Sequence, residues 1–255
     1  MTLSFAAAAA VLALAAAPAV AETSSPAIAA AVADAGRPDK DKAQDAARHP
    51  AELVAFARVK AGDTVLDIWP GAGYWSRIFS VVVGPQGKVF AYVPAEIVTF
   101  KSKPLDIAKA VAAEPGRGNV EVVSDPLAAT PPADSRDKVD VAFTFENYHD
   151  FHDTFMKGAD VDAYNRAVFQ LLRPGGYYVI VDHAAPAGSG LKNTEDLHRI
   201  DAAAVRAEVE KAGFTFDGES KVLANPDDPK DKIVFDPAIR GKTDRFAYRF
   251  VKPRT

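Results

Sequence analysis

From residue 63 onward, short apolar runs alternate with stretches of helical length. The runs are rich in Val, Ile, Phe and Tyr and occupy residues 64–69, 88–93, 120–124, 139–145 and 177–183. Apolar positions with helical spacing lie between most of these runs, at residues 75–83, 105–113 and 161–172. Near-continuous apolar strands that alternate with helices are typical of a parallel sheet covered on both faces. We therefore expect an α/β fold with a doubly wound, mostly parallel sheet.

The end of the chain extends this pattern by one helix and two strands. A helix is expected over residues 201–212, because Asp201 can cap its start and Gly213 can close its end. Two further apolar runs, at residues 220–224 and 245–252, follow each other without a helical period between them. This arrangement predicts an antiparallel pair at one edge of the sheet. No internal repeat or long linker divides residues 63–255, which predicts one α/β domain.

The first 62 residues do not follow the α/β pattern. Residues 1–21 are apolar and carry no charged side chain, and they end in Ala-Val-Ala before Glu22, as at a signal-peptide cleavage site. A buried Ala-rich helix is the alternative. We expect a cleaved signal peptide, and hence a periplasmic or secreted protein with no membrane span after cleavage. Residues 22–62 are expected to form an entry segment, flexible at first and ending in a short helix over residues 50–59.

Composition narrows the chemistry that the domain can perform. The chain has 30 Lys and Arg residues against 34 Asp and Glu residues, so it has no overall basic field for binding nucleic acid. It has no Cys, which excludes disulfides, Cys-ligated metal sites and thiol nucleophiles. Any catalysis must therefore rest on His, Asp, Glu and Tyr. We expect a small-molecule ligand, and nothing in the sequence indicates an oligomeric state.

A glycine-rich turn follows the first predicted strand, between Asp67 and Gly73. Ligands of doubly wound sheets bind beyond the carboxyl ends of the strands, where this turn lies. Gly71 and Gly73 allow the backbone to turn tightly and to approach a ligand without a Cβ in the way. Asp67 could accept hydrogen bonds from a ligand. A plain strand-to-helix turn is the alternative interpretation.

A polar run follows the fourth predicted strand, at the same edge of the sheet. His149 is our candidate for a general base, with Asp150 to orient it, because a His of nearly neutral pKa suits proton removal. Asn147 and Tyr148 are expected to shape the pocket. The alternative is that the run starts a helix and that its Asn or Asp merely caps the backbone. His183, which ends the fifth strand after Asp182, is a further catalytic candidate or a loop anchor.

The same polar run contains residue types that bind metal ions. Carboxylate and imidazole groups could hold a divalent cation at His149, Asp150, His152 and Asp153. Close spacing along the chain is weak evidence for such a site, so we assign no metal ligand from the sequence. A metal-assisted enzyme of other chemistry, using His149, His152 and Asp182, is kept as a third hypothesis. His198 and Arg199 are candidates for lining the pocket.

Several motifs together resemble the class I S-adenosylmethionine-dependent methyltransferases. The likeness covers about residues 36–253 and implies a Rossmann-like fold with an antiparallel carboxyl-terminal edge strand. It is carried by the order of the elements, by the Asp-x-x-x-Gly-x-Gly turn, and by Leu-Arg-Pro-Gly-Gly before the fifth strand. Other motifs resemble a bacterial subgroup of exported predicted methyltransferases, namely Trp69–Trp75, Asn147–Asp150, Asp182–Ala184, Leu197–Asp201 and Gly241–Phe246.

This resemblance implies S-adenosylmethionine as cofactor and methyl transfer to an unidentified small-molecule acceptor. It assigns Asp67, Gly71 and Gly73 to the methionine part of the cofactor. Asp125, after the third strand, would meet the adenine amine, and Glu96 would hold the ribose hydroxyls in place of the usual acid at the end of the second strand. The alternative is a non-catalytic exported protein that retains this fold and binds a small ligand.

The sequence departs from the family pattern at one position of the turn. Trp69 occupies the position of the family's first glycine. Its ring could stack on a ligand, although core packing is the more common role of such a residue.

Overall fold

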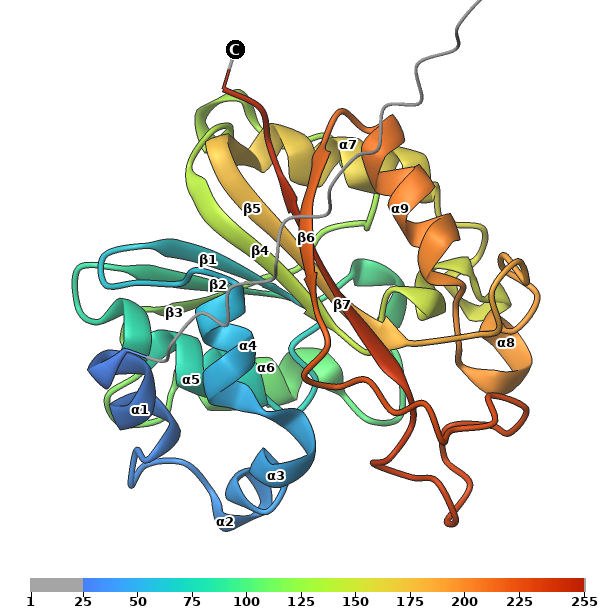
Figure 1. Ribbon diagram of the computed structural model, residues 1–255. Coiled ribbons are helices and arrows are strands. Elements are labelled where there is room, and N and C mark those ends of the chain that lie inside the picture. The colour runs from blue at the N-terminus through green and yellow to red at the C-terminus, as the bar shows by residue number, and fades with distance from the viewer. Residues whose placement is uncertain (1–24, 255) are drawn as a thin grey trace, which may run out of the picture.

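The computed structural model describes residues 25–254, which form a seven-stranded sheet with helices on both faces (Figure 1). The predicted signal peptide, residues 1–21, lies outside the described residues. The strand order is β3-β2-β1-β4-β5-β7-β6. The strands are β1 Thr64–Ile68, β2 Lys88–Tyr92, β3 Val120–Val123, β4 Val139–Phe145, β5 Leu172–His183, β6 Thr215–Ser220 and β7 Arg245–Val251.

Five strands of this sheet are parallel and the last two are not. β1 pairs in parallel with β2 and β4, β2 with β3, and β4 with β5. β7 runs antiparallel to both β5 and β6. The predicted α/β class, the mostly parallel sheet and its antiparallel carboxyl-terminal edge are therefore confirmed. The carboxyl ends of β1, β4 and β5 meet at one edge of the sheet, where the residues predicted to be functional follow them.

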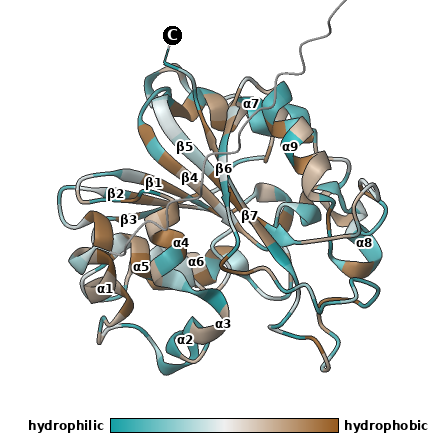
Figure 2. Ribbon diagram, viewed as in Figure 1, coloured by the Kyte–Doolittle hydropathy of each residue, from teal (hydrophilic) through white to brown (hydrophobic). Residues whose placement is uncertain are grey.

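Each face of the sheet has its own apolar core. Alternation along β1 sends Val65 to one face and Leu66 to the other, as strand geometry requires. Figure 2 shows that α5 is rich in apolar residues, whereas α2 is polar. The first core packs α1 Pro26–Val32, α4 Pro50–Phe56 and α5 Tyr74–Val83. The second packs α6 Pro104–Ala112, α7 Val161–Leu171 and α9 Ala202–Lys211.

The segment before β1 is more ordered than its sequence predicts. Residues expected to be flexible form α1, α2 Asp39–Lys42 and α3 Asp45–Arg48. Buried ion pairs hold them, because Arg37 binds Asp45 and Arg77 of α5 binds Asp41. The high content of charged residues in this segment suggests a solvated stretch. In the fold, however, each of these charges is neutralised by a partner that the local sequence does not identify.

The sequence also misplaced the edge strand β6. The apolar run at residues 220–224 was expected to be a strand, but β6 occupies the preceding residues 215–220. The residues of β6 are alternately exposed and half-buried, and Phe216 is its only large apolar residue. An edge strand can have this composition because it needs only backbone pairing and one covered face. Leu223, in the predicted run, is buried by packing after the strand has ended. In residues 25–254, no helix has the length and apolar character to cross a membrane.

Candidate active site

The turn between β1 and α5 contains three residues with left-handed backbone. Their φ angles are +56° at Trp69, +56° at Gly71 and +81° at Gly73. Gly73 is the N-cap of α5, and a Cβ at this position would meet a methyl group of Val111 at 2.6 Å. At Gly71 a Cβ would meet no atom within 4 Å. Gly73 is thus required by close packing, whereas the backbone at Gly71 borders open space that a ligand can enter.

Asp67 lies beneath this turn rather than on its surface. The residue is buried, and one carboxylate oxygen accepts a 2.5 Å hydrogen bond from the hydroxyl of Ser76 in α5. Burial raises the pKa of Asp67 to about 7, although the hydrogen bonds from Ser76 act in the opposite direction. Asp67 therefore holds the start of α5 against β1. Its contact with a cofactor stays a prediction.

Glu96 and Asp125 follow β2 and β3, as the sequence suggested. The carboxylate of Glu96 accepts hydrogen bonds at 2.9 and 3.1 Å from the backbone N–H of Leu127. The backbone carbonyl of Asp125 accepts a hydrogen bond from the hydroxyl of Tyr92. These bonds tie the ends of the two strands together. Glu96 thus already has a backbone partner, and its expected contact with a ribose stays a prediction.

A largely apolar cavity of about 510 Å³ opens between the sheet and α7. It exists because the described residues 124–138, which connect β3 to β4, contain only a short 3-10 turn, η2 Ala133–Ser135, and no α-helix. Leu66, Phe90 and Val139 therefore face a space that a longer crossover helix could fill. Asp125 and Tyr92 stand at the end of this cavity near the carboxyl ends of the strands.

The polar run after β4 lies next to the glycine turn. The side-chain amide of Asn147 donates hydrogen bonds to the backbone carbonyls of Trp69, at 3.1 Å, and of Phe145, at 2.8 Å. Asn147 thus joins the β4 loop to the β1 turn. Tyr148 points into the second core, where its hydroxyl donates to Glu208 and accepts from Asn165. Both partners of Tyr148 lie far away in sequence.

His149 is buried and held from behind by Asp182, the penultimate residue of β5. Its Nδ1 atom lies 2.8 Å from one carboxylate oxygen of Asp182, and its backbone N–H donates to the other at 2.8 Å. Asp182 has no exposed surface. Because Nδ1 faces Asp182, the other ring nitrogen, Nε2, points away from the sheet toward Asp150 and His198.

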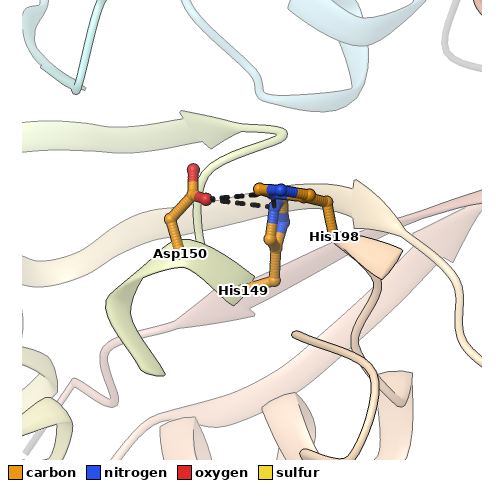
Figure 3. A group of neighbouring side chains, drawn as sticks. All are labelled: His149, Asp150 and His198. Atoms are coloured by element: carbon orange, nitrogen blue, oxygen red, sulfur yellow. Dashed lines mark hydrogen bonds and ion pairs between the residues drawn. The ribbon is translucent and has the colours of Figure 1, made fainter. Parts of the chain in front are cut away.

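Asp150 and His198 complete a cluster with His149 (Figure 3). His149 Nε2 lies 3.2 Å from Nδ1 of His198 and 3.3 Å from an oxygen of Asp150. Burial alone would lower the pKa of His149, but the charges of Asp182 and Asp150 outweigh it and raise the pKa well above its usual value. Asp150 does lie beside His149, but on its Nε2 side, so the carboxylate that orients the ring is Asp182 rather than the expected Asp150. A catalytic role for this pair stays a prediction. His198 comes from the end of α8 Thr194–Leu197, which packs beside the 3-10 turn η3 His149–His152.

The other two residues with metal-binding side chains in the polar run, His152 and Asp153, do not join this cluster. His152 turns to Glu208, with its Nε2 atom 3.2 Å from a carboxylate oxygen. Asp153 is buried, and burial raises its pKa, with a further contribution from the negative charge of Asp150. Sequence proximity did not bring these side chains into the cluster, because His152 pairs with a residue of α9 and Asp153 lies beyond the end of η3.

His183 lies behind the cluster, in surroundings whose burial favours its neutral form. Its Nδ1 atom is 2.8 Å from the hydroxyl of Thr243, and burial lowers its pKa to about 3. Its Nε2 atom is 3.9 Å from Glu146, which pairs with Arg245 of β7. His183 therefore anchors the start of β7 to the end of β5, and a catalytic role for it stays a prediction.

The position of His198 depends on an ion pair that the sequence did not reveal. Arg199, completely buried, binds Asp228 through two hydrogen bonds, at 2.7 and 3.1 Å. The stretch Asp227–Lys232 contains charges of both signs and a Pro, a composition that predicts a solvated loop, but Asp228 within it is buried. The contact spans the loops after α8 and β6, and no local sequence pattern connects them.

Comparison with known proteins places these features in a family. The model of the ubiE/COQ5 methyltransferase family matches residues 48–201, which is more than half of the chain and includes the glycine turn and the His149 cluster. The chain belongs to the ubiE/COQ5 methyltransferase family. Family membership confirms the resemblance to class I methyltransferases. The match does not test the narrower subgroup of exported proteins.

Two relatives show how far the sequence of this chain has diverged from similar proteins. The chain is 32% identical over 146 residues to the ubiquinone/menaquinone biosynthesis C-methyltransferase UbiE of Hahella chejuensis, covering 56% of this chain and 52% of that protein. It is 26% identical over 142 residues to a demethylmenaquinone methyltransferase of Listeria monocytogenes, covering 55% and 53%. The matched region thus spans about half the length of these relatives.

The fold of this family member is shared by solved structures with little sequence identity. A SAM-dependent methyltransferase from Aquifex aeolicus aligns with a TM-score of 0.58 and 20% identity, over 85% of this chain and 98% of that one. A geranyl diphosphate methyltransferase in complex with SAM aligns with a TM-score of 0.55 and 13% identity, over 88% and 94%. These likenesses support the fold alone.

Proposed function

We propose that this protein transfers a methyl group from S-adenosylmethionine to a small-molecule acceptor. One observation carries the proposal: the hydrogen bond from Asn147 to the carbonyl of Trp69 sets the His149 cluster beside the glycine turn. Methyl transfer is an in-line displacement at a sulfonium carbon. The attacking atom of the acceptor must therefore be held close to the methyl group of the donor and in line with its bond to sulfur. The turn at Gly71 borders open space for the donor, and the His149 cluster provides polar groups for the acceptor.

In this proposal the Asp182–His149 pair activates an acceptor hydroxyl. Asp182 fixes Nδ1 of His149 and so orients Nε2 toward the acceptor, which is the geometry that general acid–base catalysis requires. Removal of the hydroxyl proton by His149 increases the electron density of an oxygen, or of a conjugated carbon, that attacks the methyl group. The new bond to the methyl carbon replaces its bond to the sulfonium sulfur, whose electron pair stays on sulfur, and a ring carbon then loses its own proton. Asp150 lies on the Nε2 side of the ring and stabilises its positive charge.

We propose a hydroxylated ring of quinol type as the acceptor. The names of the two relatives above, which refer to ubiquinone and menaquinone biosynthesis, support this class. The ring of Trp69 stacks with Phe151 at a centroid distance of 6.2 Å and meets Phe155 edge-on at 6.3 Å. Aromatic side chains of this kind provide a flat apolar surface for a ring whose hydroxyl groups face a polar cluster.

Titration calorimetry with S-adenosylmethionine tests the donor half of this proposal. We expect binding by the wild type and weaker binding by Gly71→Val, because the new side chain would enter the space beside the turn and strain a left-handed residue. Gly84→Val, also at a glycine of positive φ but at the end of α5, is the matched control. Absence of heat with folded wild-type protein would exclude the methyltransferase.

The acceptor half is tested by transfer of a labelled methyl group to a soluble demethylated quinol. We expect label in the quinol with wild-type protein and none with His149→Ala. A protein that binds the cofactor but methylates none of a panel of quinols, phenols and enols would instead match the alternative, a non-catalytic ligand-binding protein.

We propose a periplasmic or secreted location for the protein. The support is the uncharged apolar stretch of residues 1–21 with its Ala-Val-Ala end. Amino-terminal sequencing of the protein recovered from the periplasm or the medium of a bacterial host should begin at Glu22. Recovery of the uncleaved chain in the cytosol only would refute export.

A further inference from the structure

Three side-chain atoms of the His149 cluster form a nearly equilateral triangle. The distances are 3.2 Å from His149 Nε2 to His198 Nδ1, 3.3 Å from His149 Nε2 to an oxygen of Asp150, and 3.4 Å from that oxygen to His198 Nδ1. All three atoms can donate a lone pair to a metal ion when the imidazoles are neutral. Figure 3 shows the three side chains converging from η3 and from the end of α8.

The size of this triangle matches one coordination geometry better than another. In a tetrahedral site with metal–ligand bonds of about 2.0–2.1 Å, neighbouring ligand atoms lie about 3.3–3.4 Å apart. In an octahedral site with similar bonds, adjacent ligands lie about 2.9 Å apart. The observed distances therefore fit one face of a tetrahedron. Two imidazoles and one carboxylate are also donors that Zn²⁺ accepts, whereas Mg²⁺ and Ca²⁺ prefer oxygen ligands.

Asp182 provides a second and independent observation. Histidines that bind metal usually donate their other ring N–H to a carboxylate or carbonyl, which fixes the ring and leaves the ligating nitrogen free. Asp182 holds Nδ1 of His149 in this way at 2.8 Å, and it is itself completely buried. The backbone N–H groups of His149 and His183 also donate hydrogen bonds to Asp182, so its carboxylate is held in place on several sides.

The charges around the cluster also favour a divalent cation. Asp150 and Asp182 bring two carboxylates into a buried region. The guanidiniums that act on this region already have partners, since Arg199 binds Asp228 and Arg245 binds Glu146. Burying charge without a partner is unfavourable, and in the absence of a metal a protonated His149 compensates only one of the two carboxylates. An ion with two positive charges would neutralise both carboxylates.

We propose that His149, Asp150 and His198 bind one Zn²⁺ ion, with its fourth position open. Three protein ligands and one open position are typical of catalytic rather than structural zinc sites. A hydroxyl oxygen of the acceptor would occupy the open position, and the metal would make that hydroxyl more acidic. With the metal bound, Nε2 of His149 is a ligand, so activation of the hydroxyl by the metal replaces direct proton removal by His149. Only this role rests on the proposed methyl transfer, whereas binding of the metal does not depend on it.

Metal binding can be measured directly on the full chain. After treatment with a chelator and dialysis, the protein is titrated with Zn²⁺ by calorimetry and with Co²⁺ by visible absorption. We expect one ion per chain and the intense visible bands of tetrahedral Co²⁺. His198→Asn should weaken binding at least 100-fold, and Asp182→Asn about 10- to 100-fold through its effect on His149. Asn suits position 198 because it tolerates the φ of +53° found there.

His152→Gln is the matched control, because His152 lies in the same turn but binds Glu208 instead. It should bind Zn²⁺ like the wild type, and circular dichroism should show that all variants fold. The proposal is overturned by wild-type protein that binds no stoichiometric Zn²⁺, by a His198→Asn variant with wild-type affinity, or by the weak bands of octahedral Co²⁺. Binding of Zn²⁺ without binding of S-adenosylmethionine would support the metal site and exclude the methyltransferase. Binding of S-adenosylmethionine without binding of Zn²⁺ would exclude the metal site and leave the methyltransferase proposal standing.

Discussion

The Nδ1 atom of His149 lies 2.8 Å from Asp182, a carboxylate with no exposed surface. Asp182 accepts two further hydrogen bonds, from the backbone N–H groups of His149 and His183. The side chain thus joins the end of β5 to the turn that follows β4.

Replacement of Asp182 by Asn should lower the free energy of unfolding by about 1–3 kcal/mol. The amide group of Asn replaces one acceptor oxygen by a donor, so buried N–H groups lose their partner. A buried donor without a partner usually costs a free energy of this size. Urea denaturation measures the effect. Asp150→Asn is the control, because Asp150 is partly exposed and its carboxylate faces the two imidazoles of His149 and His198, so its loss should be smaller. Equal effects of the two substitutions would contradict a supporting role of Asp182.

Trp69 combines a strained backbone with useful packing, and two substitutions separate these contributions. Both Trp69→Gly and Trp69→Ala remove the ring that packs on Phe151 and Phe155. Only Gly also relieves the φ of +56°. We expect both variants to be less stable than the wild type, with Trp69→Gly about 1 kcal/mol more stable than Trp69→Ala. Thermal and urea unfolding test this order, and a more stable Ala variant would contradict it.

Asp67 should make the stability of the fold depend on pH. Its pKa is about 7 in the folded protein and about 3.9 in an unfolded chain, so the folded state binds the proton more tightly. Its contribution to stability is full below about pH 4 and is lost as the pH rises through 7. Asp67→Asn keeps a neutral group at this position and has no such dependence.

The measurement compares the unfolding free energies of wild type and Asp67→Asn between about pH 5 and pH 8. As the pH rises, the unfolding free energy of the wild type should fall relative to that of the variant. The change should be up to about 1.4 kcal/mol for each pH unit. A difference that stays constant over this range would show that Asp67 titrates normally.

The buried pair of Arg199 and Asp228 should be sensitive to the loss of either partner. Asp228→Asn leaves a buried guanidinium without its counter-charge, which typically lowers stability by about 3–5 kcal/mol. Asp227→Asn, at an exposed neighbouring residue, is the matched control and should change stability little. Similar losses in the two variants, measured by urea denaturation, would contradict the importance of this pair.

The sheet could be predicted from the sequence because its signal is local. Each parallel strand is buried on both faces, so it must be an almost continuous apolar run, and β1, β4 and the apolar part of β5 are such runs. β6 has one exposed side and little apolar content, and its pairing with β7 depends on backbone hydrogen bonds that any sequence can make. The prediction failed there for this reason.

The candidate site could be predicted only in part. The sequence by itself determined which chemistry is available, since a chain without Cys must use His, Asp and Glu, and it determined that the glycine turn and the polar run follow neighbouring strands. Only the tertiary structure decided that His149 meets His198 rather than His152, and that Asp67 supports the turn from within. The physical reason is that strand and helix periodicity are properties of neighbouring residues, whereas the direction of a side chain in a turn, and its partner from a distant loop, depend on how the elements pack.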